Sequence, residues 1–396
     1  MKTKIYFYVS LLLLVFVSYG CDESDDYQYI TSPSKPEPEE EIINWQDAAD
    51  KSSQAFLDNF WNEDKNFFNY YPYKADTPAE DWHYWPQAHA MDVIIDAFNR
   101  TGDTKYSEYF SKWHTGVKQK SGGSYFNNFY DDMEWICLTM IRLYESTHED
   151  KYMETVQLIW DEIKTGWNDR YDGGFLWNKD QSSKNACSNG PAGIIAARLY
   201  QINEKPEDLE WAKKIYSWQR SKLFNEDTGA VYDNINNTGD GDKIADFSLT
   251  YNQGTHLGMA HELYKITGET SYLTDACKAA DFCISKLIDE QNNILKSEGT
   301  GDGGLFKGIF IRYFVKLLLD KDLNANDRER YVNFFNHNAE VLWTKGVNRD
   351  ELIYHHNWAR IVLAPDNKSI TDMPCQVSGC ALIEAKAFYE KAILKQ

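Results

Sequence analysis

Apolar residues recur every three to four positions along most of the chain, the spacing of one face of an α-helix. No convincing run of alternating apolar and polar residues, the pattern of a half-buried strand, interrupts this spacing from Ile43 onward. We therefore predict an all-α protein of about twelve helices. The predicted helices span residues 45–61, 85–100, 106–117, 131–145, 151–167, 191–201, 209–223, 247–266, 272–288, 305–319, 328–342 and 374–394.

The connections between these helices alternate between short and long. Each short connection ends a helix, places an acidic residue where the next helix begins and puts a tyrosine in its first turns. The three clearest short connections are 101–106, 147–152 and 267–272. The long connections are rich in glycine and aromatic residues, and they span 121–130, 172–189, 225–248, 289–304 and 346–372. This alternation indicates a helical hairpin repeated roughly every 45–60 residues.

Six helical hairpins with all long connections on one side favour a closed ring, an (α/α)6 toroid with inner and outer rings of helices. An open helical solenoid is the alternative, but twelve helices with distinctive loops and no capping repeats favour closure. Functional residues should then gather where the long loops meet the ends of the inner helices.

Composition and charge narrow the classes of ligand. The net charge of −20 argues against nucleic acid, which requires a basic surface, and disfavours an anionic polysaccharide. Aromatic residues make up 15% of the chain, with 13 Trp and 26 Tyr, which exceeds what a core needs. Most of these rings must still pack in the core, but we expect others in a cleft, where they stack on sugar rings. A neutral carbohydrate ligand fits best.

Residues 1–21 resemble a bacterial lipoprotein signal: Lys2 and Lys4 precede a short apolar run that ends in a lipobox-like sequence at Cys21. The acidic run 22–26 resembles the surface-export signal of some Gram-negative lipoproteins, or is simply a solvated tether. Charge and proline over 22–43 predict a disordered linker. We therefore predict an outer-membrane lipoprotein anchored only by lipid at Cys21, at the cell surface or on the periplasmic face, with a single domain over 44–396.

The six cysteines of this domain have no zinc-binding spacing, so we expect no metal ion, and nothing suggests a cofactor. Cys137, Cys277 and Cys283 lie in apolar helical patterns, where free buried thiols are common. Cys375 and Cys380 are close enough in sequence to form a disulfide, but the sequence does not decide it.

Aromatic, amide and acidic residues gather in five stretches on the long-loop side, at 82–92, 130–135, 173–191, 250–255 and 301–310. Asn252 and Gln253 would be costly to bury without partners, which a polar ligand at the ring centre would supply. Ser188 and Asn189 could simply cap the following helix. The candidate substrate-binding residues are Tyr84, Trp85, Gln87, His89, Tyr130, Trp135, Trp177, Asn178, Asn185, Asn189, Asn252, Gln253, Asp302, Gly304, Phe306 and Lys307.

Two adjacent carboxylates, Asp131 and Asp132, stand at the predicted start of a helix. Such residues can be helix caps and nothing more. They can also be a catalytic pair, because retaining glycosidases need two carboxyl groups roughly 5–5.5 Å apart, and neighbouring side chains on a helix diverge by about 100°. Repulsion within a partly apolar cleft would raise one pKa and leave the other low. The sequence alone does not order the two.

In this order, WPQAHAMD, YDDMEW, GGFLWN with NACSNGPA, TYNQG and GDGGLFKGIF resemble the sequences of glycoside hydrolase family 76, the bacterial endo-α-1,6-mannanases. The similarity covers about residues 44–394. It implies an (α/α)6 fold and retaining, endo-acting cleavage of the α-1,6-linked backbone of fungal mannan. It also implies that Asp131 is the nucleophile and Asp132 the general acid/base. From their positions beside the pair, we expect Tyr130 and Trp135 to tune it by hydrogen bonding and desolvation.

Two other interpretations remain open. An unsaturated-uronide hydrolase or a sugar epimerase could share six hairpins, but a uronide enzyme should bring Arg or Lys to the site, where Lys184, Lys307 and Arg312 are the candidates. A non-catalytic glycan-binding lipoprotein would keep the aromatic and amide residues without needing the aspartate pair. We expect a monomer whose partner is a polysaccharide and not nucleic acid.

Overall fold

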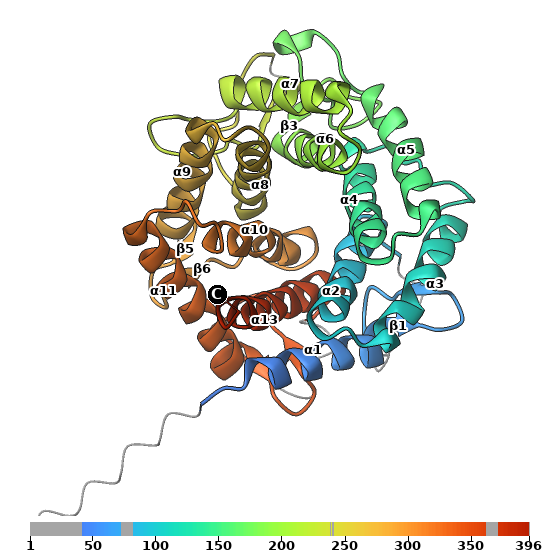
Figure 1. The fold of residues 1–396 in the computed structure, drawn as a ribbon, viewed down its shortest axis with the longest axis vertical. Helices are drawn as coiled ribbons and strands as arrows, with labels where there is room; N and C mark the ends of the chain where they lie inside the picture. The colour runs from blue at the N-terminus through green and yellow to red at the C-terminus, as the bar shows by residue number, and fades with distance from the viewer. Residues whose placement is uncertain (1–41, 73–81, 238, 240, 362–370, 396) are drawn as a thin grey trace, which may run out of the picture. The chain divides into compact units, whose positions relative to one another are not determined.

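Twelve long helices in the described part of the chain form two concentric rings (Figure 1). The inner ring contains α2 (Pro86–Thr101), α4 (Tyr130–Thr147), α6 (Gly190–Asn203), α8 (Thr250–Thr267), α10 (Asp302–Leu318) and α13 (Met373–Ile393). The outer ring contains α1 (Trp45–Phe60), α3 (Thr104–Lys120), α5 (Asp150–Lys164), α7 (Pro206–Lys222), α9 (Thr270–Lys286) and α11 (Ala325–Val341). Each inner helix packs against the next, and α13 packs against α2, which closes the ring. The predicted toroid and all twelve predicted helices are confirmed.

The computed structural model describes residues 42–72, 82–237, 239, 241–361 and 371–395. Residues from Ile43 onward form one compact unit. The predicted lipoprotein signal with Cys21, and all but the last two residues of the predicted tether, lie outside the described residues. Within the described ranges, no helix is both long and apolar enough to cross a membrane.

The short connections reverse the chain with the same local structure. The helices α2, α4 and α8 each end at a residue in the left-handed conformation, namely Gly102, His148 and Gly268. The predicted acidic cap is confirmed at Asp103, whose side chain accepts a hydrogen bond from the Lys105 backbone N–H at 3.0 Å. Glu149 and Glu269 are also N-cap residues, as predicted, but their side chains make no capping hydrogen bond. One explanation is their longer side chain, since the preferred capping residues are Ser, Thr, Asp and Asn.

The long connections contain four two-stranded antiparallel sheets that the sequence did not predict. They pair β1 (Trp61–Asn62) with β2 (Phe67–Phe68), β3 (Lys184–Asn185) with β4 (Asn234–Ile235), β5 (Ile288–Asp289) with β6 (Ile294–Leu295), and β7 (Val347–Asn348) with β8 (Ile353–Tyr354). Amide side chains from the inner helices hold two of these hairpins. Gln87 accepts from the Phe68 N–H at 2.9 Å and donates to its carbonyl at 2.7 Å. Gln376 bonds in the same way to the Tyr354 N–H and the Leu352 carbonyl.

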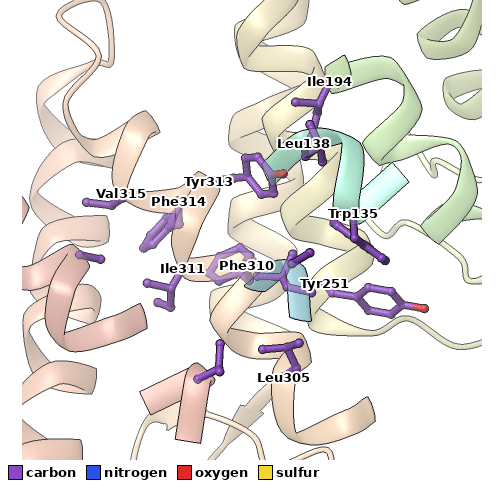
Figure 2. Packing of buried hydrophobic residues seen from close by; sticks show 14 of the residues in the cluster. Trp135, Leu138, Ile194, Tyr251, Leu305, Phe310, Ile311, Tyr313, Phe314 and Val315 are labelled. Atoms are coloured by element: carbon purple, nitrogen blue, oxygen red, sulfur yellow. The ribbon is translucent and has the colours of Figure 1, made fainter. Parts of the chain in front are cut away.

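The inner helices are buried on nearly all sides, because they pack on one another and on the outer ring. In α10, side chains such as Leu305, Phe310 and Phe314 project in several directions into the core (Figure 2). Gly254 lets α8 approach α10 closely, since a Cβ there would lie 2.6 Å from the Cα of Phe310. The inner ring is therefore a tightly packed frame that fixes where each helix begins.

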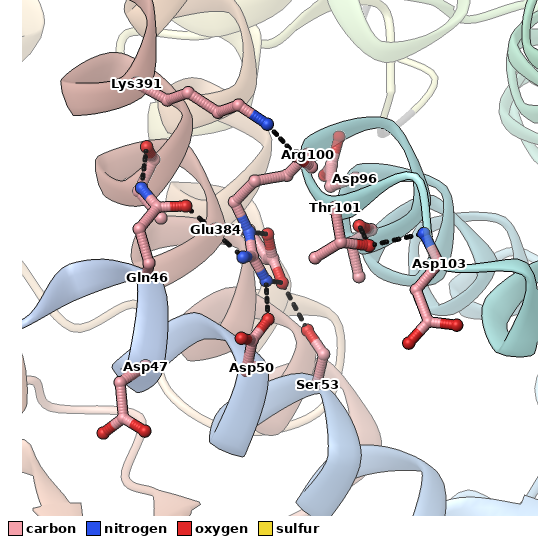
Figure 3. Close-up of polar contacts among 12 residues, drawn as sticks. Gln46, Asp47, Asp50, Ser53, Asp96, Arg100, Thr101, Asp103, Glu384 and Lys391 are labelled. Carbon is pink, nitrogen blue, oxygen red and sulfur yellow. Dashed lines mark hydrogen bonds and ion pairs between the residues drawn. The ribbon is translucent and has the colours of Figure 1, made fainter. Parts of the chain in front are cut away.

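A buried ion pair joins the first and last parts of the ring (Figure 3). The Arg100 guanidinium at the end of α2 donates to the Glu384 carboxylate in α13 at 2.7 Å, and to Asp50 of α1 at 2.8 Å. Ser53 of α1 also donates to Glu384, at 2.6 Å. Three helices from the two ends of the domain are thus tied together by the buried Arg100 and Glu384 side chains and by the exposed Asp50 carboxylate.

Candidate active site

A cleft with a volume of about 430 Å³ lies where the N-terminal ends of the inner helices meet the long loops. Eight of the residues proposed from the sequence line this cleft, and the aspartate pair is among the eight. These residues are Trp85, Asp131, Asp132, Trp135, Trp177, Asn185, Asp302 and Phe306. The long-loop motifs therefore do converge on one site.

Asp131 receives hydrogen bonds from three sides. Its Oδ1 accepts from the Asp132 backbone N–H at 3.1 Å, and its Oδ2 accepts from the Trp177 indole Nε1–H at 3.2 Å. The Cys187 thiol, which lines the same cleft, also interacts with this carboxylate. Burial raises the pKa of Asp131 to about 6, while the three donors act in the opposite direction because they stabilise the ionised form. Asp131 thus satisfies one free N–H in the first turn of α4 as well as lining the cleft, although the N-cap residue of this helix is Phe129, which makes no side-chain capping bond.

Asp132 has the opposite surroundings. No hydrogen bond within the described ranges reaches its side chain, and it faces like charge. Burial, followed by the negative charges of Asp131 and Asp302, raises its pKa well above the usual value of 3.8. Adjacent residues of the same type therefore differ in protonation: Asp132 retains its proton at a pH where Asp131 is ionised.

The loop before α6 positions the groups that bond to Asp131. The Trp177 carbonyl accepts from the Tyr130 N–H at 2.9 Å, which ties this loop to the start of α4. Beneath it, the Lys184 ammonium donates to the carbonyls of Asn168 at 2.7 Å, Gly174 at 2.8 Å and Gly173. Burial lowers the pKa of Lys184 to about 8. A buried lysine thus organises the loop from within and does not extend into the cleft.

Aromatic rings form the remaining walls. Tyr251 of α8 and Phe306 of α10 stack with ring centroids 4.0 Å apart and planes at 10°. On another wall, the Trp85 indole donates to Asp302 at 2.9 Å, which joins α2 to α10. Apolar faces and a polar rim suit a sugar, whose C–H faces stack while its hydroxyls form hydrogen bonds.

Several proposed binding residues lie behind the cleft and bond to the protein itself. Tyr84 donates to the Tyr125 carbonyl at 2.6 Å. Asn178 accepts two backbone N–H groups in its own turn. Tyr130 packs its ring against Gly166, and Gly304 packs against Cys375. Gln87 and Asn189 bond to backbone groups of Phe68 and Phe175.

The amides of α8 find partners without a ligand. Asn252 donates to the Asp233 carboxylate at 2.7 Å, and Gln253 donates to the Val231 carbonyl at 3.2 Å. Lys307 is also buried: it donates to the His356 carbonyl at 2.5 Å and lies over the Trp358 ring. The argument that buried amides need a ligand therefore does not apply to these N–H donors.

His89 is not among the residues that line the cleft; it lines a second cavity of about 240 Å³. This cavity is lined by residues of the inner helices, including Trp135, and it contains Arg312, which pairs with Asp96 at 3.0 Å. The His89 ring lies 4.8 Å from that of Trp135. Burial lowers the pKa of His89 to about 3, so it is neutral.

Sequence reasoning missed eight residues of the cleft lining: His83, Phe129, Cys187, Asp233, Asn237, Phe247, Leu249 and Tyr251. Three of them, His83, Cys187 and Tyr251, lie inside the stretches that stood out, next to residues that turn away from the cleft. Asp233 precedes and Asn237 follows β4, a strand of two residues, where no periodicity shows which side chain faces inward.

Among the described residues, no group of three or more His, Cys, Asp or Glu side chains could hold a metal ion. The six cysteines of the described ranges are free thiols, including Cys375 and Cys380. The cleft is lined by carboxyl, amide, thiol, imidazole and aromatic groups, together with one leucine.

A pair of buried carboxyl groups with unequal proton affinity in an aromatic cleft is the arrangement that glycoside hydrolases use. The chain belongs to Glycosyl hydrolase family 76, whose sequence profile matches residues 44–396. It is thus a member of a family of enzymes that hydrolyse glycosidic bonds.

Solved structures and curated sequences agree with this family. The chain is 38% identical to an α-1,6-mannanase from Salegentibacter sp. HEL1_6, covering 87% of this chain and 100% of that one with a TM-score of 0.82. An inactive variant of an α-1,6-mannanase from the same organism, with two aspartates replaced, binds α-1,6-mannotetrose; it is 37% identical over 88% of this chain and 100% of that chain, with a TM-score of 0.82. A putative mannan endo-1,6-alpha-mannosidase of Schizosaccharomyces pombe is 26% identical over 59% of this chain, and the match spans 58% of that relative's length.

Proposed function

We propose that this protein is a retaining, endo-acting glycoside hydrolase that cleaves α-1,6-mannosidic bonds in the backbone of fungal-type mannan. The observation that carries the proposal is the unequal environment of the aspartate pair. Three donors stabilise the Asp131 carboxylate, while burial and two neighbouring charges keep the proton on Asp132. A retaining glycosidase needs one carboxylate to attack and one acid to protonate the leaving oxygen.

In the first step, Asp132 donates its proton to the glycosidic oxygen while a carboxylate oxygen of Asp131 attacks the anomeric carbon. The bond between that carbon and the glycosidic oxygen breaks, and a glycosyl ester forms on Asp131. In the second step, Asp132, now ionised, takes a proton from a water molecule whose oxygen attacks the same carbon. The ester breaks, both aspartates return to their starting protonation states, and two inversions give net retention.

The substrate and the endo action come from the relatives. The inactive Salegentibacter variant, in which two aspartates are replaced, is in complex with α-1,6-mannotetrose. The Schizosaccharomyces relative is called a putative mannan endo-1,6-alpha-mannosidase. No lysine or arginine lies among the described residues that line the cleft. This disfavours an unsaturated-uronide substrate, because a buried carboxylate needs a cationic partner.

The test is product analysis on linear α-1,6-mannan with the anomeric configuration followed by NMR. We expect manno-oligosaccharides of several lengths that first appear as the α-anomer. Asp131→Ala and Asp132→Ala should each abolish turnover while circular dichroism remains unchanged. Binding of mannan without cleavage by the wild-type protein would favour the glycan-binding interpretation, and near wild-type turnover in either variant would overturn the assigned roles.

We further propose that the protein is a monomeric outer-membrane lipoprotein at the cell surface, with Cys21 acylated and residues 22–43 acting as a tether. The lipobox-like sequence and the acidic run after Cys21 support this. Labelled palmitate should be incorporated into the wild-type chain but not into Cys21→Ala, which should leave the membrane fraction. Protease added to intact cells should release the domain. Protection from the protease would indicate the periplasmic face instead.

A further inference from the structure

Cys187 lies in the cleft beside the proposed nucleophile and is held there by its surroundings. It is the central residue of a short 3-10 turn, Ala186–Ser188, between β3 and α6. The Ala186 N–H donates to the Asp233 carbonyl at 2.8 Å, and the Asn189 side chain bonds to the Phe175 backbone and to the Asn185 carbonyl at 2.8 Å. Only 3% of Cys187 is exposed, so its thiol has little freedom to turn elsewhere.

The thiol is the middle member of a row of three groups. Asp131, Cys187 and Tyr251 line the same cleft, where the thiol interacts with the Tyr251 hydroxyl on one side and with the Asp131 carboxylate on the other. Burial and the charges of Asp131 and Asp233 raise the pKa of Cys187 well above its usual value, so the sulfur keeps its hydrogen. The thiol is therefore a permanent donor to Asp131 and not a nucleophile or a metal ligand.

The strength of this donor matters for a carboxylate that must be both ionised and reactive. An S–H group is a weak hydrogen-bond donor compared with a hydroxyl or an indole N–H. A strong donor would stabilise the ionised carboxylate further and make it less basic, whereas an apolar group would leave one side of it without a partner.

We infer that Cys187 is a positioning residue for the proposed hydrolysis: it orients the Asp131 carboxylate through a weak hydrogen bond and keeps that carboxylate both ionised and nucleophilic. Trp177 and the Asp132 N–H fix the carboxylate from other directions. Tyr251 in turn orients the thiol, which connects α8 to the nucleophile on α4. This inference rests on the proposed function, because it assigns Cys187 a part in the step that Asp131 performs.

The test compares Cys187→Ala and Cys187→Ser in the full chain, using kcat/KM on linear α-1,6-mannan across pH. Loss of the donor in Cys187→Ala should move the acidic limb of the profile to higher pH by about one unit and lower kcat about tenfold. The hydroxyl of Cys187→Ser should move that limb to lower pH and restore most of kcat. KM should change little in both variants.

Cys137→Ala is the matched control. Cys137 is a buried thiol on α4, the helix that carries Asp131, and its sulfur lies against the Val156 carbonyl, away from the cleft. It should leave the pH profile unchanged even if its melting temperature falls. An unshifted acidic limb in Cys187→Ala, or identical limbs in the Ala and Ser variants, would overturn the inference while leaving the proposed function intact. Absence of mannan cleavage by the wild-type chain would instead contradict the proposed function.

Discussion

The Trp177 indole donates a hydrogen bond to Oδ2 of Asp131 at 3.2 Å. Asp131 lies in the first turn of α4, whereas Trp177 lies in the long loop between α5 and α6. The contact is fixed from both ends, because the Tyr130 N–H, one residue before Asp131, donates to the Trp177 carbonyl at 2.9 Å. A ring of Phe129 packs 5.1 Å from the indole. Trp177 is thus held as a donor to the nucleophile and not only as a surface for sugar stacking.

Trp177→Phe should therefore weaken catalysis more than binding. A phenyl ring keeps most of the stacking surface but has no N–H. The Asp131 carboxylate therefore loses a donor that stabilises its ionised form, and the pKa of Asp131 rises. We expect kcat to fall by about 10- to 100-fold and the acidic limb of the pH profile to move upward. Trp218→Phe is the control, since the Trp218 indole donates to the Tyr171 carbonyl at 2.9 Å and does not line the cleft. Equal losses in the two variants would argue against a role for the Asp131 contact.

The dependence of activity on pH should be bell-shaped, with both limbs set by the aspartate pair as a unit. The acidic limb should lie near pH 6, where Asp131 ionises, and the alkaline limb higher, where Asp132 loses its proton. Asp302→Asn removes one of the charges that hold the proton on Asp132, so the alkaline limb should move to lower pH. Asp320→Asn, whose partner is His261, should leave both limbs in place. An alkaline limb that stays fixed in Asp302→Asn would contradict this electrostatic coupling.

The helices and their order could be predicted because their apolar spacing extends over three or more turns, and the inner ring repeats it six times. The long loops could not be predicted in the same way. Their four two-stranded sheets have strands of two residues, too short to show alternation, and β3 pairs with β4 across nearly fifty positions of sequence. Which loop residues face the cleft depends on that pairing.

The partners of buried amide side chains could not be predicted from the sequence either. The sequence indicated that Asn252 and Gln253 were polar residues in an apolar helix and suggested a ligand as their partner, and it offered Gln87 as a candidate binding residue. In the structure they bond to loop backbone or to Asp233, because inner helices use such side chains to hold the hairpins. An amide that binds backbone and one that binds sugar look alike in sequence. Asn185 differs only in that its position in β3 turns it into the cleft.

The aspartate pair should reduce the stability of the fold at the pH where it works. The pKa of Asp132 is raised above its usual value of 3.8, so the folded state favours the protonated form more than the unfolded state does. The stability associated with this proton is fully present below pH 3.8 and is lost as the pH rises through the folded-state pKa. Asp132→Asn removes this dependence and should melt at a higher temperature than the wild type near pH 7–8.

Calorimetry from pH 4 to pH 8 should show the difference in melting temperature between Asp132→Asn and the wild type widening with pH. The variant should also be inactive, which is the usual trade between stability and a functional charge. A surface substitution of the same kind, Asp58→Asn, should give a constant difference across the range. A gap that narrows as pH rises would show that Asp132 is not held protonated by the fold.

The Arg100–Glu384 pair should affect stability without affecting catalysis. Arg100 lies at the C-terminal end of α2, whereas the cleft is lined by Trp85 at the N-terminal end of the same helix. Both side chains are almost fully buried, with 2% and 1% exposed. Arg100→Met would leave the Glu384 carboxylate buried without its partner and should lower the free energy of unfolding by about 3–5 kcal/mol. Replacing both residues, as Arg100→Met with Glu384→Leu, should cost less than Arg100→Met alone, since no isolated charge remains. The exposed pair of Lys51 and Asp47 is the control, and its loss should cost about 0–1 kcal/mol. Urea unfolding measures the free energy of unfolding of the single variant, the double variant and the control, and kcat per folded molecule should match the wild type in each. A double variant less stable than Arg100→Met would mean that the ion pair itself, and not the uncompensated charge, determines the stability of this contact.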